Sequence, residues 1–212
     1  MRKKLIIIAL RKNKLHYLLP LTIIYGILPL ISFSTIVTYG LEQSCRIVVF
    51  SAQALVPIFS LLFPMAILNV WIGNEGWETL QSCNRRHRSC SDEIVFLCLA
   101  FLVVILPFFL LFWSVYGFLW IEIVRLYAQC FLVMSAQYFC TAFTRNVTLG
   151  CIPITVYLFS CICLNDKEGY ADFSILELYS LSDSLLMKKY ISIYLVSLLL
   201  IVIGKIAESK RV

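Results

Sequence analysis

The chain has 212 residues, of which 61% are hydrophobic and 14% charged, and its mean hydropathy is +0.89. Soluble domains contain about 45–50% apolar and about 25% charged residues, so a single globular core of this size cannot bury such an apolar excess. The composition excludes a soluble enzyme, a nucleic-acid binder and a secreted disulfide scaffold, and it predicts that lipid is the main solvent. Membrane topology and anionic lipid headgroups then explain the net charge of +6 better than nucleic acid does.

Six apolar stretches follow one another along the chain, each about long enough to cross a bilayer as a helix. They lie at about residues 15–39, 47–72, 94–118, 124–143, 147–164 and 190–206. Residues 1–14 are basic and only briefly apolar, which predicts a helix lying at the membrane surface. We therefore expect an all-α, polytopic bundle of six transmembrane helices, forming a single transmembrane domain over residues 1–212.

Prolines lie inside four of these stretches, where neighbouring helices can satisfy the backbone carbonyls that a proline leaves free. Pro57 and Pro64 are seven residues apart and fall on roughly one face of the second stretch. This spacing predicts that the second span is bent.

The positive charges predict the orientation of the bundle. With the N-terminus in the cytoplasm, the inner segments hold 13 of the 18 lysines and arginines, which leaves five outside. Positive residues favour the cytoplasmic side of a membrane. We expect both termini in the cytoplasm of a bacterial cell, a cytoplasmic loop over residues 73–93 and an outer loop over residues 165–189 in a multi-pass protein of the plasma membrane.

The polar segment after the second stretch is the most informative motif. It reads GNEGWETL from Gly73 to Leu80, with Glu75 and Glu78 three residues apart and hence on one face of a helix. Trp77 between them is a residue that often lies at the membrane–water boundary. The segment predicts a short surface helix at the cytoplasmic face.

This segment resembles the membrane subunits of type-2 ABC exporters, and so do the six spans, the basic N-terminal helix, the longer outer loop before the sixth span and the basic C-terminus. In that family an acidic, glycine-containing coupling helix follows the second span and binds in a groove of the ATPase subunit. The resemblance implies that the coupling residues here are Glu75, Gly76, Trp77, Glu78, Thr79 and Leu80. It also implies ABC ATPase subunits and a second permease, either a copy of this chain or a homologous one, as partners.

The sequence contains no ATP-binding motif and no common enzyme motif, which is consistent with the resemblance. There is no G-x-x-x-x-G-K-[ST] motif for ATP, so a partner subunit must bind the nucleotide and this chain needs no cofactor of its own. No H-E-x-x-H or G-x-S-x-G motif indicates an enzyme. We expect export of a hydrophobic or amphipathic substrate: a peptide or bacteriocin, a drug or a lipid.

Cys83, His87 and Cys90 form a second cluster in the same loop. They are zinc-competent ligand types, but three neighbouring arginines oppose a cation, so we expect no metal site. A thiol and an imidazole beside positive charge also suggest a membrane-embedded cysteine endopeptidase that processes a signal peptide. A membrane substrate-binding subunit of an importer is a third alternative, because its size and span count are similar.

Charges within the spans are few, and no acid lies at the centre of a span. Proton- or ion-coupled carriers usually need such an acid, so its absence favours an ATP-driven partner. Glu122 and Arg125 lie three residues apart at the outer start of the fourth span and are expected to pair. Scattered polar residues are expected to join helices rather than bind substrate; they include Ser32, Ser34, Thr35, Asn69, Ser135, Gln137 and Thr155.

Overall fold

The computed structural model describes residues 14–71, 90–117, 120–164, 174–176 and 183–209, and all statements below concern these residues. The described part is α-helical and contains no strand. Six helices in it are long and apolar enough to cross a membrane, one for each apolar stretch of the sequence. The predicted all-α fold with six helices of membrane-spanning length and apolarity is therefore confirmed for this part of the chain. The interfacial helix predicted over residues 1–14 falls almost entirely outside it.

The first span runs over Lys14–Tyr39 and is interrupted in the middle. It consists of α2 (Lys14–Thr22), the π-helical segment η1 (Ile23–Ile27) and α3 (Leu28–Tyr39). Pro29 lies in the first turn of α3 and has no backbone N–H to donate to the carbonyl four residues earlier. The wider π-helical turn lies at the place where that bond is missing.

The second span is bent, as the prolines predict. It comprises α4 (Leu41–Ser60) and α5 (Leu62–Trp71), with a turn at Leu61 between them. Pro64 removes the N–H that would bond to the carbonyl of Ser60, which places the break at this point. The span begins at Leu41 rather than near residue 47, because Gly40 ends α3 with a φ of +78° and α4 follows at once.

The other four spans are single helices, and three of them are longer than the apolar stretches. They are α7 (Ser91–Tyr116), α8 (Trp120–Thr144), α9 (Val147–Leu164) and α10 (Asp183–Ser209). Polar and charged residues extend the helices past the apolar stretches, as Asp92 and Glu93 do in the first turn of α7. Acidic side chains at a helix N-terminus interact favourably with the helix dipole.

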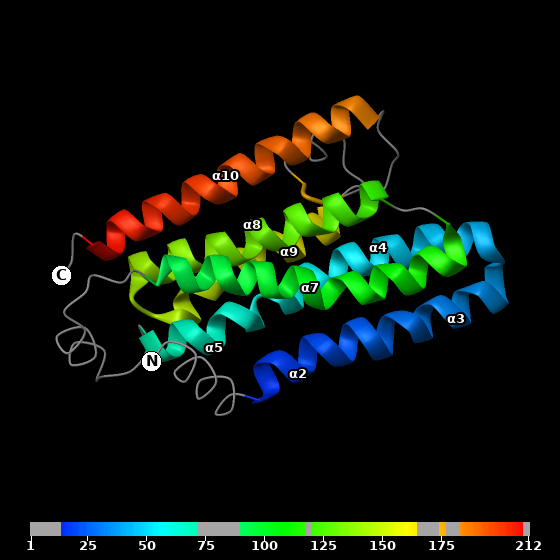
Figure 1. The fold of residues 1–212 in the computed structure, drawn as a ribbon, viewed down its shortest axis with the longest axis horizontal. Helices are drawn as coiled ribbons and strands as arrows, with labels where there is room; N and C mark the ends of the chain where they lie inside the picture. Colours follow the sequence, from blue (N-terminus) through cyan, green and yellow to red (C-terminus); the bar gives the residue numbers. More distant parts are fainter. Residues whose placement is uncertain (1–13, 72–89, 118–119, 165–173, 177–182, 210–212) are drawn as a thin grey trace.

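The helices run antiparallel in sequence, so the start of α2, the end of α5, the start of α7 and the end of α10 lie at one end of the bundle (Figure 1). We call this the terminal end; it is the end that the charge pattern assigns to the cytoplasm. The turn between α3 and α4 and the start of α8 lie at the opposite end, which we call the far end. Helix α8 is the central helix and packs against α4, α5, α7, α9 and α10.

Apolar and polar side chains together fill the inside of the bundle, while large apolar side chains cover much of its outside, unlike the polar surface of a soluble protein. Buried polar residues on three helices are less than 1% exposed, whereas many large apolar side chains of α7 and α10 are about half exposed or more. The buried ones are Ser44, Ser60, Gln129, Ser135, Gln137, Thr141 and Ser197. Lipid is no more apolar than leucine, so polar bonds and close packing hold membrane helices together.

Several of these contacts join helices as the sequence predicts. Ser32 and Ser44 both bond to the hydroxyl of Tyr116, which links α3, α4 and α7. Tyr25 and Tyr127 donate to the carbonyls of Val104 and Leu102, both in the part of α7 just before Pro107. Gln137 donates from α8 to the Cys151 sulfur of α9 at 3.0 Å.

Helix α9 crosses α8 closely because Gly150 faces Thr141. A Cβ at Gly150 would lie 2.5 Å from Thr141 Oγ1 and 2.9 Å from the Thr141 backbone nitrogen. No real Cβ approaches backbone this closely, so only glycine permits this separation of the two helices.

Candidate functional site

The predicted ATPase-coupling residues Glu75, Gly76, Trp77, Glu78, Thr79 and Leu80 lie outside the described residues, and so do Cys83 and His87. The coupling assignment therefore stays a prediction. What the structure places is the chain on either side: α5 ends at Trp71 and α7 begins at Ser91, both at the terminal end of the bundle (Figure 1).

Cys90 is the one member of the cysteine–histidine cluster within the described part of the chain. It is fully buried, and its backbone N–H donates to the carboxylate of Glu208. Burial raises the pKa of the Cys90 thiol well above its usual value, and the nearby carboxylates Glu208 and Glu93 raise it further. The thiolate is the nucleophile in cysteine enzymes, so this position is unsuited to attack on a peptide. In the described ranges, no group of three acidic, cysteine or histidine residues is placed to hold a metal ion.

The most polar site inside the bundle lies at its far end, around an ion pair within α8. Arg125 Nη1 lies 3.2 Å from Glu122 Oε1, which confirms the expected pairing. The Arg125 side chain is 6% exposed and that of Glu122 is 21% exposed. The Arg125 guanidinium also lies over the ring of Tyr190 on α10, with Cζ 5.8 Å from the ring centroid. The ring offers the cation a second favourable contact inside an apolar bundle.

Two glutamines extend this ion pair across the bundle. Gln53 of α4 donates from Nε2 to Glu122 Oε2 at 3.3 Å. Gln129 of α8 is fully buried and donates to the backbone carbonyl of Ile175 at 2.6 Å and to Gln53 Oε1 at 3.4 Å. We call Gln53, Glu122, Arg125 and Gln129 the polar network. It ties α4 and α8 to the buried residues Ser174–Leu176, which precede α10.

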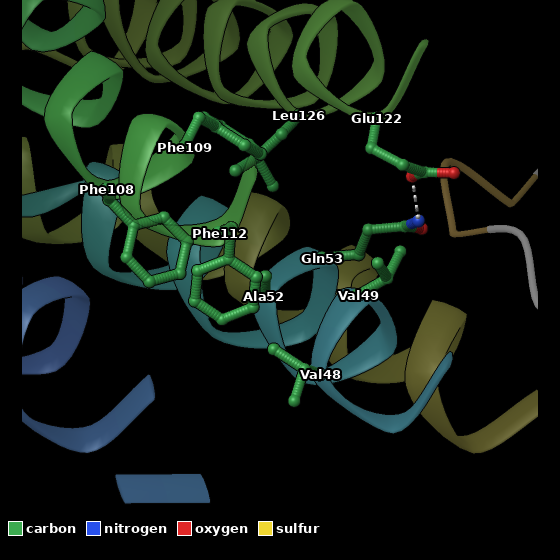
Figure 2. A pocket seen from close by; sticks show the side chains of 9 residues that line it. All are labelled: Val48, Val49, Ala52, Gln53, Phe108, Phe109, Phe112, Glu122 and Leu126. Carbon is green, nitrogen blue, oxygen red and sulfur yellow. Dashed lines mark hydrogen bonds between the residues drawn. The ribbon is translucent and has the colours of Figure 1, made fainter. Parts of the chain in front are cut away.

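A small pocket adjoins the polar network between α4, α7 and α8, and Figure 2 shows its lining. Gln53 and Glu122 form one side and are joined by a hydrogen bond, while the rings of Phe108 and Phe112 lie on the other side. The remaining lining residues are Val48, Val49, Ala52, Phe109 and Leu126. The cavity volume of about 20 Å³ suits one water molecule. In this conformation the site therefore offers a carboxylate and an amide beside aromatic surface, in a space too small for an organic substrate.

Sequence reasoning identified Glu122 and Arg125 but missed Gln53 and Gln129. The signal for Gln129 was available: positions 122, 125 and 129 follow the helical spacing and form one polar stripe on an apolar helix. Gln53 is an isolated amide among apolar neighbours, and no spacing rule connects it with α8. Only the packing of α4 on α8 reveals that it belongs to the network.

Six helices long and apolar enough to cross a membrane, with large apolar side chains on the outside of the bundle, indicate a multi-pass membrane protein. Comparison of the chain with protein-family models, with curated proteins and with solved structures finds no match. The particular role of the chain therefore rests on its own residues.

Proposed function

We propose that the chain is the permease subunit of an ATP-driven exporter in a bacterial plasma membrane, paired with a second permease and with separate ABC ATPase subunits. The observation that carries the proposal is topological. The end of α5 and the start of α7, which flank residues 72–90, lie at the terminal end of the bundle. The start of the first span and the end of the last span lie at the same end. An ATPase at that face would contact the acidic Glu75–Glu78 segment that follows the second span.

The positions of the acids support an ATP-driven mechanism over an ion-coupled one. Within the described helices, every acidic residue lies among the first or last three residues of its helix: Glu42, Asp92, Glu93, Glu122, Asp183 and Glu208. Carriers driven by protons or sodium ions usually place an acid near the middle of the membrane. An external energy source then has to move the helices, and the closure of an ATPase dimer supplies such a push.

The pocket supports an amphipathic substrate. Its aromatic side would contact the apolar part of the substrate, while Glu122 and Gln53 would bind a polar group. Entry requires α4, α7 and α8 to move apart, because the pocket holds no more than a water molecule in this conformation. The interruption at Leu61 lies directly after α4, where the regular helical hydrogen bonding of the second span is broken.

The direct test is purification of the tagged chain in mild detergent and again in lipid nanodiscs, followed by mass spectrometry. We expect a P-loop ATPase in stoichiometric amount, and either one permease sequence or two. Recovery of the chain alone under both conditions would contradict the proposal.

A charge reversal tests the coupling segment. Glu78→Lys is expected to leave membrane insertion unchanged, to weaken ATPase binding and to abolish transport, because it places a positive charge in the predicted contact. Glu42→Lys is the matched control, since Glu42 is an exposed carboxylate at the far end of the bundle. Equal ATPase recovery with both variants would remove the coupling role from Glu78.

A further inference from the structure

Three helices meet at a single carboxylate at the terminal end of the bundle. Glu208, next to the last residue of α10, accepts hydrogen bonds from the Cys90 backbone N–H at 3.0 Å and 3.2 Å, one to each carboxylate oxygen. The same carboxylate accepts a bond from the Tyr138 hydroxyl of α8 at 2.7 Å. We call Glu208, Tyr138 and the Cys90 amide the clasp.

Glu208 acts on α7 rather than on its own helix. A negative charge at the C-terminus of α10 faces the negative end of that helix dipole, which is unfavourable. At the N-terminus of α7 the same charge faces the positive end of a 26-residue helix and accepts one of its unsatisfied N–H groups. Cys90 itself contributes no side-chain cap to α7. The first turn of α7 therefore takes its cap from another helix.

The clasp is built into the packing. Tyr138 is fully buried, and a buried hydroxyl needs a hydrogen-bond partner, which Glu208 provides. Gly204 lies one turn before Glu208 and lets α10 approach this ring: a Cβ there would lie 2.7 Å from Tyr138 Cε1. Lys205 and Asp92 lie 4.0 Å apart beside the clasp, but both are more than half exposed and contribute little.

The position of the clasp gives it a role in energy coupling, which rests on the proposed function. Cys90 is the first described residue after the segment that holds Glu75–Leu80, so the clasp fixes the point at which that segment enters α7. We infer that Glu208 is a positioning residue for energy coupling: it joins the start of α7 to α8 and α10, so that a push on the preceding segment moves three helices together. Without it, mainly side-chain packing would join the start of α7 to these helices.

The first arm of the test uses the chain without any ATPase. The chain has nine cysteines, so labelling with ¹⁵N-cysteine in nanodiscs gives a small set of amide signals, and the Cys90 signal is assigned by its loss in Cys90→Ser. We expect hydrogen exchange at this amide to be about tenfold faster or more in Glu208→Ala, because a hydrogen bond to a charged acceptor is lost. Glu42→Gln, at an exposed position, is the matched control and should leave it unchanged.

The second arm uses the complete complex, reconstituted with its ATPase in vesicles. We expect Glu208→Ala and Glu208→Gln to retain ATPase binding and ATP hydrolysis but to lower transport per ATP hydrolysed by about fivefold or more. A merely structural loss would lower both rates together. If Glu208→Ala does not fold, Tyr138→Phe, which removes only the bond to α8, is measured in its place.

The two arms separate the inference from the function on which it depends. Unchanged hydrogen exchange at the Cys90 amide in Glu208→Ala overturns the clasp. Faster exchange together with normal transport per ATP hydrolysed overturns the coupling role of Glu208. Failure of the wild-type chain to bind an ATPase or to transport overturns the proposed function instead, whatever the exchange rates show. Faster exchange together with uncoupled hydrolysis supports the inference.

Discussion

Removal of the Arg125 charge is the sharpest test of the polar network. In Arg125→Met the Glu122 carboxylate stays in the bundle without the guanidinium that lies 3.2 Å from it. Two unit charges about 4 Å apart at an effective dielectric constant of about 20 attract by about 4 kcal/mol. Breaking a buried pair by removing one partner costs about 3–5 kcal/mol. Since the Glu122 side chain is 21% exposed, we expect the lower limit of about 3 kcal/mol.

Glu122→Gln should cost less, because Arg125 keeps its contact with the ring of Tyr190. The double variant Glu122→Gln/Arg125→Met should be more stable than Arg125→Met alone, because it leaves no uncompensated charge. Reversible unfolding in mixed detergent and SDS micelles measures these differences. Glu42→Gln/Arg46→Met is the matched control at two exposed positions of α4. The reasoning is refuted if Arg125→Met lowers the free energy of unfolding no more than this control does. It is also refuted if the loss of stability in the double variant equals the sum of the losses in the two single variants.

Three further predictions concern packing and reactivity. Gly150→Ala should destabilise the chain by about 1–3 kcal/mol, because the added Cβ meets the backbone of Thr141. Gly26→Ala, whose Cβ meets nothing within 4 Å, is the control in the same unfolding assay. Equal losses of stability in the two variants would count against close packing of α8 and α9. Tyr127→Phe should cost about 1 kcal/mol by removing the hydroxyl that donates to a carbonyl of α7, and an unchanged unfolding midpoint would show that this bond contributes nothing. Cys90 should react with N-ethylmaleimide at pH 8 at least about tenfold more slowly in the native chain than in SDS, because burial raises the pKa of its thiol and each pKa unit lowers the thiolate fraction about tenfold. Site-resolved mass spectrometry measures the two rates, and equal rates would contradict the burial of the thiol.

The clasp and the polar network lie at opposite ends of α8, the helix that packs against five others. Glu208 and Tyr138 join its second half to the terminal end, while Arg125 and Gln129 join its first half to α4 and α10. If α8 moves as a rigid body, a displacement at the clasp reaches the pocket without a chain of intermediate contacts.

The sequence alone determined the class of fold. Hydrophobic runs of the right length predict six spanning helices, because a backbone in lipid must satisfy its hydrogen bonds within a helix. Pro57 and Pro64 predicted the bend in the second span, since proline has no N–H to donate. The spacing of Glu122 and Arg125 predicted their ion pair, because both partners lie on one helix and neighbouring helices need not be known.

Tertiary structure decided which distant residues meet. Gln53 and Gln129 lie 76 positions apart and Cys90 and Glu208 lie 118 apart, and no periodicity relates residues on different helices. Contacts between helices also depended on context: Glu208 of α10 accepts the N–H of Cys90 at the start of α7, and α9 approaches α8 closely because Gly150 meets Thr141. Hydrophobicity fixes that a helix enters the membrane, whereas close packing and the pairing of buried polar groups fix its neighbours.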